Sequence, residues 1–289
     1  MKKILITGIN SYIGTSFEHW VRGRQGEYQI NTISLKTSEW KEQSFASYDI
    51  IFHVAGIAHV DANDSTQEEQ DTYYRVNRDL TIELARKAKE EGVKQLIFMS
   101  SIIVYGDNTN LGDTRIITRH TKPTPSNCYG DSKLQAEQAI LPLQSDEFHV
   151  AILRAPMIYG KGSKGNYSRL AGLATKTRIF PKIQNQRSML HIDNLCEFIR
   201  LIIDNDDSGI FYPQNEEYIC TSELVRQIAA AHGKILHLTS AFNSLLFLFV
   251  PRRITNKMFG TLIYDKSMSQ YKDKYCVRSY EETIQLTES

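Results

Sequence analysis

Tyr129 and Lys133 stand four residues apart in a segment with helical character, and Ser101 precedes the tyrosine by 28 positions. Side chains four residues apart lie on the same face of a helix. A phenol and an ammonium held side by side suit proton transfer to a carbonyl or hydroxyl, because a neighbouring cation lowers a tyrosine pKa from its ordinary value of about 10. The serine hydroxyl would supply a second hydrogen bond to the reacting oxygen. The three residues are therefore the predicted catalytic group.

The N-terminus has the strand, loop and helix pattern of a dinucleotide-binding site. An apolar run over Lys3–Thr7 breaks into a turn at Gly8, and a helix then runs through Gly14. The first glycine permits the tight turn, the last lets the helix pack on the strand, and the helix N-terminus offers N–H groups to a pyrophosphate. Ser11 replaces the usual middle glycine, and its hydroxyl can hydrogen-bond a phosphate oxygen. A glycine-rich turn without a ligand is the alternative for this segment taken alone.

The end of the second predicted strand bears on which dinucleotide binds. NAD-selective sites carry a carboxylate roughly 20 residues past the glycines, hydrogen-bonded to the ribose 2′-OH. Here no carboxylate occurs between Thr32 and Glu39. Ser34 and Lys36 could instead hold a 2′-phosphate through a hydroxyl and a point charge. We expect NADP(H), with NAD(H) as the second choice and a plain surface role for Lys36 as the alternative.

Apolar runs typical of buried parallel strands alternate with helical patterns in the first half of the chain. This alternation predicts an α/β fold with a doubly wound parallel sheet (a Rossmann fold) and helices on both faces. The connection from Lys36 to Tyr48 is short, so the second helix is expected to be abbreviated. The predicted strands are Lys3–Thr7, Gln29–Leu35, Asp49–Val54, Gln95–Met99 and His149–Leu153, and a long helix is predicted over Glu68–Glu91.

The pattern changes in the second half of the chain. We expect residues 1–160 to form the dinucleotide-binding domain and residues 161–289 to form mainly a smaller substrate-binding lobe, with some segments returning to the first domain. Ligands should lie outside the carboxyl ends of the strands. Helices are predicted over Asn166–Thr175, Ile192–Asn205, Ser222–His232 and, at the end of the chain, Tyr280–Leu286.

Composition excludes several classes of function. A formal net charge of +1 on 289 residues gives no overall field for nucleic acid or an anionic membrane. Four scattered cysteines without Cys-x-x-Cys spacing, and a first strand that leaves no room for a signal peptide, predict free thiols in a cytoplasmic protein. The histidines, including His53 and His59, lack metal-ligand spacing, so no metal is expected. The apolar run Leu245–Val250 is shorter than the roughly 20 residues that span a bilayer. Core packing or a lid over the substrate is expected there, with a membrane-surface role as the alternative.

With these motifs in this order, the chain resembles the extended short-chain dehydrogenases/reductases, the NAD(P)-dependent family of sugar-nucleotide epimerases, dehydratases and 4-keto-sugar reductases. The resemblance implies that Ser101, Tyr129 and Lys133 hold the sugar carbon whose hydride moves to or from the nicotinamide. The matching segments are Thr7–Gly14, Phe52–Gly56, Val76–Asn77, Ser100–Ser101, Val104–Gly106, Tyr129–Lys133, Leu153–Arg154, Tyr159–Gly160 and Arg187–Asp193. The predicted cofactor contacts are Gly8, Asn10, Ser11, Tyr12, Ile13, Gly14, Ser34, Lys36, Ala55, Gly56, Tyr129, Lys133 and Pro156.

Two residues after the serine narrow the reaction. Sugar-nucleotide 4,6-dehydratases of the family place an Asp-Glu pair where this chain has Ile102-Ile103. Neither isoleucine can move a proton, which argues against dehydration and against 3,5-epimerisation at this site. Simple oxidation–reduction remains, ending either in net reduction or in 4-epimerisation by transient oxidation.

On the substrate side, the resemblance implies that Arg187 contacts the diphosphate of a nucleotide sugar, with a salt bridge to Asp193 as the alternative. Asn166 opens a helix whose N–H groups are placed to add to that contact. Pro156-Met157 replaces an asparagine common in 4-epimerases.

The expected protein is an NAD(P)H-dependent reductase of a nucleotide-linked 4-keto(-6-deoxy) sugar, UDP-linked and destined for a bacterial surface polysaccharide, with Tyr129 as acid/base at C4. The first alternative is a UDP-hexose or UDP-N-acetylhexosamine 4-epimerase with tightly bound NAD. A small-ketone or steroid dehydrogenase and a non-enzymatic cofactor sensor are the others. The family's four-helix interface, here Glu68–Glu91 and Cys128–Ile140, predicts a homodimer.

Overall fold

The computed structural model describes residues 1–24, 26–57, 66–106, 112–241, 243 and 250–289. His59 and all of the run Leu245–Val250 except its last residue lie outside these ranges. The chain forms two compact units, which we call unit 1 and unit 2. Unit 1 comprises Met1–Gly106, Pro123–Ala155 and Leu195–Pro213, and unit 2 comprises Asp107–Lys122, Pro156–Asn194 and Gln214–Ser289.

Unit 1 is built on a six-stranded parallel sheet with the strand order β10-β6-β4-β3-β1-β2. The predicted doubly wound parallel sheet is therefore confirmed. The order reverses direction between β1 and β3, the kind of position at which such sheets bind ligands. The strands are β1 (Lys2–Thr7), β2 (Tyr28–Ile33), β3 (Ile50–His53), β4 (Gln95–Ser101), β6 (His149–Ala155) and β10 (Gly209–Phe211).

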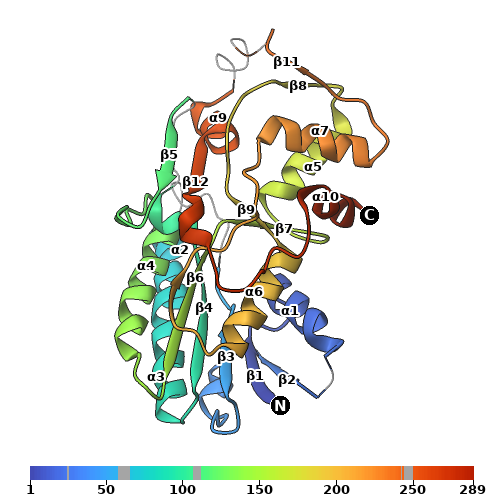
Figure 1. The fold of residues 1–289 in the computed structure, drawn as a ribbon. Coiled ribbons are helices and arrows are strands. Elements are labelled where there is room, and N and C mark those ends of the chain that lie inside the picture. Colours follow the sequence, from blue (N-terminus) through green and yellow to red (C-terminus); the bar gives the residue numbers. More distant parts are fainter. Residues whose placement is uncertain (25, 58–65, 107–111, 242, 244–249) are drawn as a thin grey trace. The chain divides into compact units, whose positions relative to one another are not determined.

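Helices cover both faces of this sheet (Figure 1). Helices α3 (Leu80–Glu90) and α4 (Cys128–Ile140) bury apolar side chains against Leu5, Leu96 and Phe98 of the strands. Helix α1 (Tyr12–Arg22) packs on the other face, where Phe17 meets Phe52 edge-on with ring centroids 5.5 Å apart. Apolar strands buried on both faces are typical of parallel sheets.

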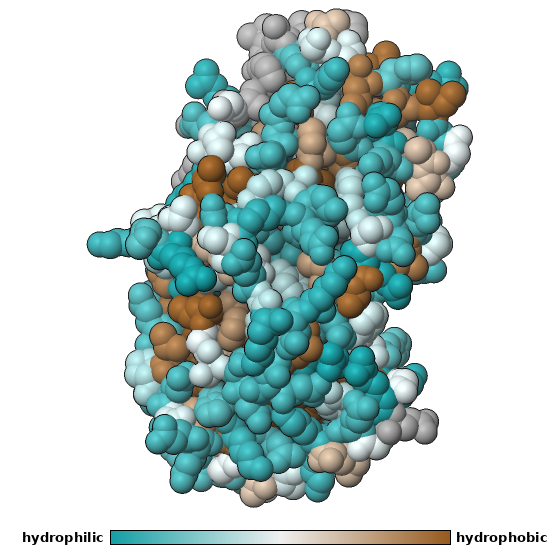
Figure 2. Space-filling model, viewed as in Figure 1, coloured by the Kyte–Doolittle hydropathy of each residue, from teal (hydrophilic) through white to brown (hydrophobic). Residues whose placement is uncertain are grey.

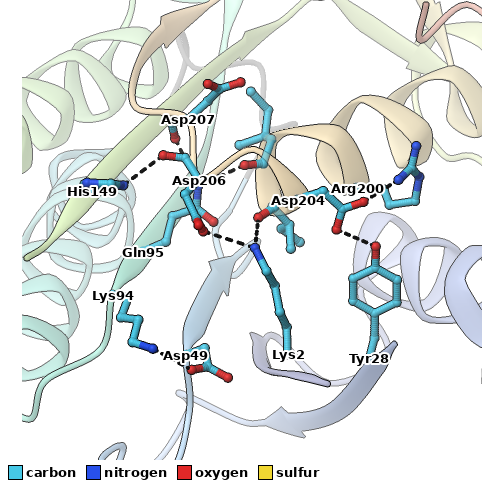
Figure 3. A network of polar contacts seen from close by, with 12 residues as sticks. Lys2, Tyr28, Asp49, Lys94, Gln95, His149, Arg200, Asp204, Asp206 and Asp207 are labelled. Atoms are coloured by element: carbon cyan, nitrogen blue, oxygen red, sulfur yellow. Dashed lines mark hydrogen bonds and ion pairs between the residues drawn. The ribbon is translucent and has the colours of Figure 1, made fainter. Parts of the chain in front are cut away.

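Helix α6 (Ile192–Asp204) brings the later part of the chain back to the amino ends of the strands (Figure 3). The Lys2 ammonium pairs with Asp206 at 3.1 Å, just beyond the helix. Gln95 Nε2 donates to the carbonyl of Asp207 at 3.0 Å, and His149 Nδ1 lies 2.8 Å from the carbonyl of Asp206. Polar contacts thus fix the amino end of the sheet in unit 1.

The prediction of one continuous α-helix over Glu68–Glu91 is wrong, because a π-helical turn interrupts it. The structure has α2 (Gln67–Tyr73), a π-helical turn (Tyr74–Asp79) and then α3. The apolar spacing of the segment does not reveal the π-helical turn. This turn contains Asn77, which is buried in unit 1. Such bulges frequently mark functional sites. The abbreviated second helix is confirmed as a 3₁₀ helix (Ser38–Lys41).

The described residues of unit 2 form three two-stranded parallel sheets and four α-helices that lie wholly within the unit. Its apolar core gathers residues from α5, α7, α9 and α10, including Leu170, Val225, Phe259 and Ile284. The predicted helices of this half are confirmed to within one or two residues at their ends. The sheets pair β5 (Thr114–Ile117) with β12 (Thr261–Tyr264), β7 (Met157–Tyr159) with β9 (Met189–His191), and β8 (Ile179–Pro181) with β11 (His237–Thr239). The helices are α5 (Asn166–Lys176), α7 (Thr221–Ala231), α9 (Arg252–Phe259) and α10 (Tyr280–Glu288).

Candidate active site

The loop between β1 and α1 has the geometry of a dinucleotide cradle. Gly8 has φ +91°, a conformation that suits glycine, and a Cβ there would lie 3.3 Å from the backbone of Ala55. A Cβ on Gly14 would lie 2.9 Å from Ile6 and 2.5 Å from the Ser11 hydroxyl, so only glycine fits. The two glycines therefore perform the turn and the close helix packing that the sequence predicted for a dinucleotide-binding loop.

Ser11 has a structural role that the sequence did not reveal. It is the N-cap residue of α1, and its hydroxyl oxygen accepts the Gly14 N–H at 3.2 Å. Its own O–H is still a donor, so capping is compatible with the predicted contact to a phosphate oxygen. Asn10 before it has φ 61°, which orients the loop, and Tyr12 and Ile13 open the helix.

The loop after β3 is clamped by Asn77. Asn77 Oδ1 accepts the Ile57 N–H at 2.9 Å, and Nδ2 donates to the Ile57 carbonyl at 3.0 Å. A Cβ on Gly56 would stand 3.0 Å from Asn77 Oδ1 and 3.3 Å from Lys133 Nζ. The structure therefore places Ala55 and Gly56 beside the glycine loop and beside the predicted catalytic lysine. Asn77 is a site residue that the sequence offered only as part of the Val76-Asn77 motif.

Helix α4 approaches the end of β4 through a glycine. The Asn127 side chain caps the helix by accepting the Gly130 N–H at 2.9 Å. A Cβ on Gly130 would be 2.7 Å from the carbonyl oxygen of Ile103. Because position 130 lacks a side chain, the first turn of α4, which carries Tyr129, can lie against the 3₁₀ helix (Ile102–Tyr105) that follows Ser101. Gly130 is thus a second positioning residue that sequence reasoning missed.

The structure brings Tyr129 and Ser101 together. The Ser101 hydroxyl is near enough to the Tyr129 phenol to affect its pKa, and the Ser101 oxygen accepts the Ile103 N–H at 3.3 Å. Burial raises the pKa of Tyr129 above its ordinary value, with a smaller opposing effect from the Ser101 hydroxyl. The Tyr73 ring lies 6.1 Å away, centroid to centroid. The phenol is therefore held in its protonated form, as a proton donor.

Lys133 is buried one turn after Tyr129, with 6% of its surface exposed. Its ammonium donates to the Met99 carbonyl at 2.9 Å and lies 4.6 Å from the centre of the Phe98 ring. Burial lowers the pKa of Lys133 to about 8, against an opposing effect of the Glu137 carboxylate. The prediction that this cation lowers the pKa of Tyr129 is wrong for this structure. Burial of the phenol is the dominant cause of its shift, and the ammonium is directed to a backbone carbonyl.

A buried ion pair anchors α4 to the sheet below the candidate site. Glu137 and Arg154 meet at 2.6 Å, with only 3% and 7% of their side chains exposed. Arg154 Nη1 also donates to the Tyr105 hydroxyl at 2.6 Å, and Ser100 hydrogen-bonds the same carboxylate. Glu137 is one turn beyond Lys133, so the pair fixes the helix that carries both predicted catalytic side chains. Only Arg154 of this pair belonged to a motif seen in the sequence.

His53, at the end of β3, is a structural histidine. Nδ1 lies 2.7 Å from the Thr7 hydroxyl and Nε2 lies 2.9 Å from the Thr81 hydroxyl. Burial lowers its pKa to about 3, with Lys133 as a smaller cause. The neutral imidazole therefore ties β1 and β3 to α3. Among the described residues, no group of three or more His, Cys, Asp or Glu could hold a metal ion.

Ser34 and Lys36 follow β2, whose last residue Ile33 pairs with Thr7 at the end of β1. The Ser34 hydroxyl accepts the Lys36 N–H at 3.3 Å, and the Lys36 side chain is exposed. The Ile33 carbonyl also accepts the Gly8 N–H at 2.9 Å. The end of β2, which these two residues follow, is consequently next to the glycine loop, where the adenosine ribose of a dinucleotide would lie.

The remaining predicted residues belong to unit 2. Pro156 immediately precedes β7, and Asn166 is the first residue of α5. Arg187 Nη1 donates to the carbonyls of Lys257 and Gly260 at 3.1 and 3.0 Å, which attaches its guanidinium to the C-terminal end of α9. Asp193 pairs with Arg278 at 3.0 Å, so the alternative of an Arg187–Asp193 bridge is wrong.

Comparisons with known proteins agree with this geometry. The model of the NAD dependent epimerase/dehydratase family matches residues 4–213. A UDP-glucose 4-epimerase from Vibrio cholerae is 30% identical over 256 residues, which is 81% of this chain and 76% of the relative. The chain therefore belongs to the NAD dependent epimerase/dehydratase family.

Two solved structures share the fold. The UDP-glucose 4-epimerase of Thermus thermophilus, in complex with NAD, has a TM-score of 0.75 and 18% identity, with coverage of 99% of this chain and 97% of that one. The dTDP-4-dehydrorhamnose reductase of Bacillus anthracis, in complex with NADP, has a TM-score of 0.68 and 18% identity, with coverage of 99% and 98%. The fold thus serves both epimerases and reductases, with either dinucleotide.

Proposed function

We propose that the protein is an NADPH-dependent reductase of a nucleotide-linked 4-keto-6-deoxy sugar. The observation that carries this choice is the end of β2. Its last residue, Ile33, hydrogen-bonds Gly8 of the glycine loop, and Ser34 and the exposed Lys36 follow it with no carboxylate before Glu39. A point charge and a hydroxyl suit a 2′-phosphate, whereas a carboxylate would suit the 2′-OH of NAD. Reductases exchange a reduced cofactor in each cycle, which fits a phosphate-selective site.

The proposed acid–base residues, Tyr129 and Ser101, also support reduction of a ketone. The bound nicotinamide would supply a hydride to C4 of the sugar. Tyr129 would give its phenolic proton to the C4 oxygen, and Ser101 would hydrogen-bond that oxygen. Because burial keeps Tyr129 protonated, the group is prepared to donate a proton to a ketone. The isoleucines at 102 and 103 supply no second acid or base for dehydration.

The second candidate is a UDP-hexose or UDP-N-acetylhexosamine 4-epimerase with tightly held NAD. It is favoured by the similarity to the Vibrio cholerae UDP-glucose 4-epimerase over 81% of the chain. An epimerase must both remove and return the hydride, so it keeps its dinucleotide between the two half-reactions. For either activity, Arg187 and the N-terminus of α5 are the proposed contacts to a substrate diphosphate, UDP-linked in our proposal.

Cofactor binding separates the two candidates. The experiment measures the dissociation constants of NADPH and NADH for the wild type and for Lys36→Glu at fixed ionic strength. A charge-assisted hydrogen bond of roughly 1.5–3 kcal/mol predicts a wild-type preference for NADPH of about tenfold to a hundredfold, nearer tenfold after salt screening. The variant should reverse this preference, while Lys41→Glu, a nearby charge reversal at a lysine that pairs with Glu83, should not.

Two results would overturn the reductase. One is release of stoichiometric NAD when the purified protein is denatured in acid. The other is equal affinity for NADH and NADPH with a ratio that does not respond to position 36. Either result would make the 4-epimerase the better assignment.

A further inference from the structure

The chain is nearly neutral overall, but its charges are segregated. Residues 161–192 contain seven Lys or Arg and residues 232–264 contain four, and neither stretch contains an Asp or Glu. Both stretches belong to unit 2. The net charge of +1 therefore conceals a locally basic region.

The β8–β11 sheet of this region turns apolar side chains outward as well as inward. Phe180 and Leu236 are buried in the core of unit 2. Their neighbours Ile179 and Ile235 are 56% and 76% exposed, and Ile235 is the most exposed large apolar side chain among the described residues. Ile179 pairs with His237 across the sheet, and Ile235 lies two residues before His237 in the chain, so the two isoleucines are near each other where the β8–β11 pair begins. Figure 2 shows apolar atoms gathered among polar ones in the upper part of the view, where Figure 1 draws these strands.

Basic side chains surround the two isoleucines. Lys176, Arg178 and Lys182 precede and follow β8, and all three are exposed. Lys234 adjoins Ile235, and its ammonium donates to the Thr175 carbonyl at 2.6 Å. None of these four cations forms an ion pair with a carboxylate of the residues described in the structure. Glu288, the carboxylate that reaches this end of unit 2, contacts His232 and Tyr167 instead.

Helix α9 adds to the same end of unit 2. Phe259 of this helix lies 5.9 Å from Phe180 of β8, centroid to centroid. The helix exposes Ile254, Arg252 and Lys257. It repeats the combination of an exposed isoleucine with cations that β8 and β11 present.

We propose that β8, β11 and α9 form a surface that binds a lipid bilayer containing anionic headgroups. Apolar side chains ringed by Lys and Arg are the composition of interfacial membrane-binding surfaces, in which buried apolar area and attraction to anionic lipids act together. Nucleic acid would match the cations but leave the isoleucines without a partner, since bases stack on aromatic side chains. The surface excludes the residues proposed for catalysis, so this inference is independent of the proposed function.

The test is co-sedimentation of the full chain with vesicles of phosphatidylcholine alone or mixed in equal parts with phosphatidylglycerol. The wild type should bind only the anionic vesicles, and binding should weaken as salt is raised. Lys176→Glu with Arg178→Glu should weaken binding by about fivefold or more for each residue, the equivalent of about 1 kcal/mol each. Ile179→Ser with Ile235→Ser should weaken it while leaving the cations in place.

Lys94→Glu with Lys122→Glu is the matched control, because it makes the same charge change at exposed lysines outside this surface. It should bind the anionic vesicles like the wild type. The proposal is wrong if the wild type ignores anionic vesicles or binds neutral ones equally well. It is also wrong if the control weakens binding as much as the surface variants, or if heparin binds the protein while vesicles do not. The wild-type vesicle and salt series decides the question even if a variant fails to fold.

Discussion

The two ends of the six-stranded sheet in unit 1 are built in opposite ways. At the amino end, charged and polar side chains pair with one another and with the backbone, as Lys2 does with Asp206 and as Gln95 does with the carbonyl of Asp207 (Figure 3). At the carboxyl end, the backbone at Gly8 and Gly14 packs so closely on Ala55, Ser11 and Ile6 that a Cβ would collide with them. One end is closed by its own contacts, and the other carries the glycine loop that we propose to bind the dinucleotide.

The difference also concerns where ion pairs lie. Lys2 and Asp206 keep 32% and 58% of their side chains exposed, whereas Glu137 and Arg154, which anchor α4, keep 3% and 7%. Exposed pairs contribute little to stability, but breaking a buried pair leaves an uncompensated charge. The helix that carries the candidate site therefore depends on a few buried contacts, and removing one partner of such a contact should strongly destabilise the protein.

Removing one member of each pair should sharpen this comparison most. Glu137→Ala should lower the free energy of unfolding by about 3–5 kcal/mol, since Arg154 would be left buried and unpaired. Asp206→Ala, the matched change at the amino end, should lower it by no more than about 1 kcal/mol. Urea unfolding of both variants measures the difference. Equal losses would contradict the contrast between the two ends.

Tyr129→Phe should reduce turnover by about a hundredfold or more, because it removes the proposed general acid. Dinucleotide affinity should change little. Tyr74→Phe is the control, since its hydroxyl also hydrogen-bonds a neighbour, Asp131 at 2.8 Å, but has no proposed catalytic part. Steady-state kinetics measure the turnover of both variants, and the control should stay near the wild type. If the turnover of Tyr129→Phe were also within a few-fold of the wild type, the catalytic group would be misassigned.

The lowered pKa of Lys133 should make the free energy of unfolding depend on pH. Its folded pKa of about 8 lies below the ordinary value of 10.5, so between these values the unfolded chain binds more protons and stability rises with pH. Lys133→Met lacks this rise. The unfolding free energy of the wild type relative to the variant should increase by on the order of 2–3 kcal/mol from pH 8 to pH 10.5. A difference that stays constant over this window would show that the buried ammonium is not destabilised.

Gly130→Ala tests the approach of α4 to the end of β4. The new Cβ would meet the Ile103 carbonyl at 2.7 Å, so the helix must shift, at a cost of about 1–3 kcal/mol and with Tyr129 displaced from Ser101. Gly172→Ala in α5 is the control, because nothing lies within 4 Å of its Cβ position. It should stabilise the protein slightly. Turnover and urea unfolding are measured for both variants. If Gly130→Ala matched Gly172→Ala in both, the close approach of α4 to the end of β4 would not matter as we argue.

The sequence predicted the sheet correctly because its strands carry local signals, and the candidate site was proposed from signals of the same kind. Apolar runs marked the strands, and the four-residue spacing of Tyr129 and Lys133 put both on one helix, which the structure has as α4. The glycine loop was readable because a tight turn and a close helix approach each require glycine.

What the sequence missed depends on contacts between distant segments. The π turn is tied to the clamp that Asn77 makes on the Ile57 backbone, 20 residues away. The Glu137–Arg154 pair joins helix α4 to strand β6, and the spacing of the two residues in the sequence does not predict it. The pKa of Tyr129 was misjudged for the same reason, since the direction of the Lys133 ammonium is set by the Met99 carbonyl.

The central claim is net reduction of a nucleotide-linked 4-keto sugar, and the direct measurement is product formation with the cofactor followed in parallel. The protein would be incubated with a UDP-linked 4-keto-6-deoxy sugar and NADPH, and separately with UDP-glucose. The account predicts one NADPH oxidised for each 4-hydroxy sugar formed, with no UDP-galactose from UDP-glucose. Conversion of UDP-glucose to UDP-galactose without added cofactor, and no oxidation of NADPH by the keto sugar, would contradict it.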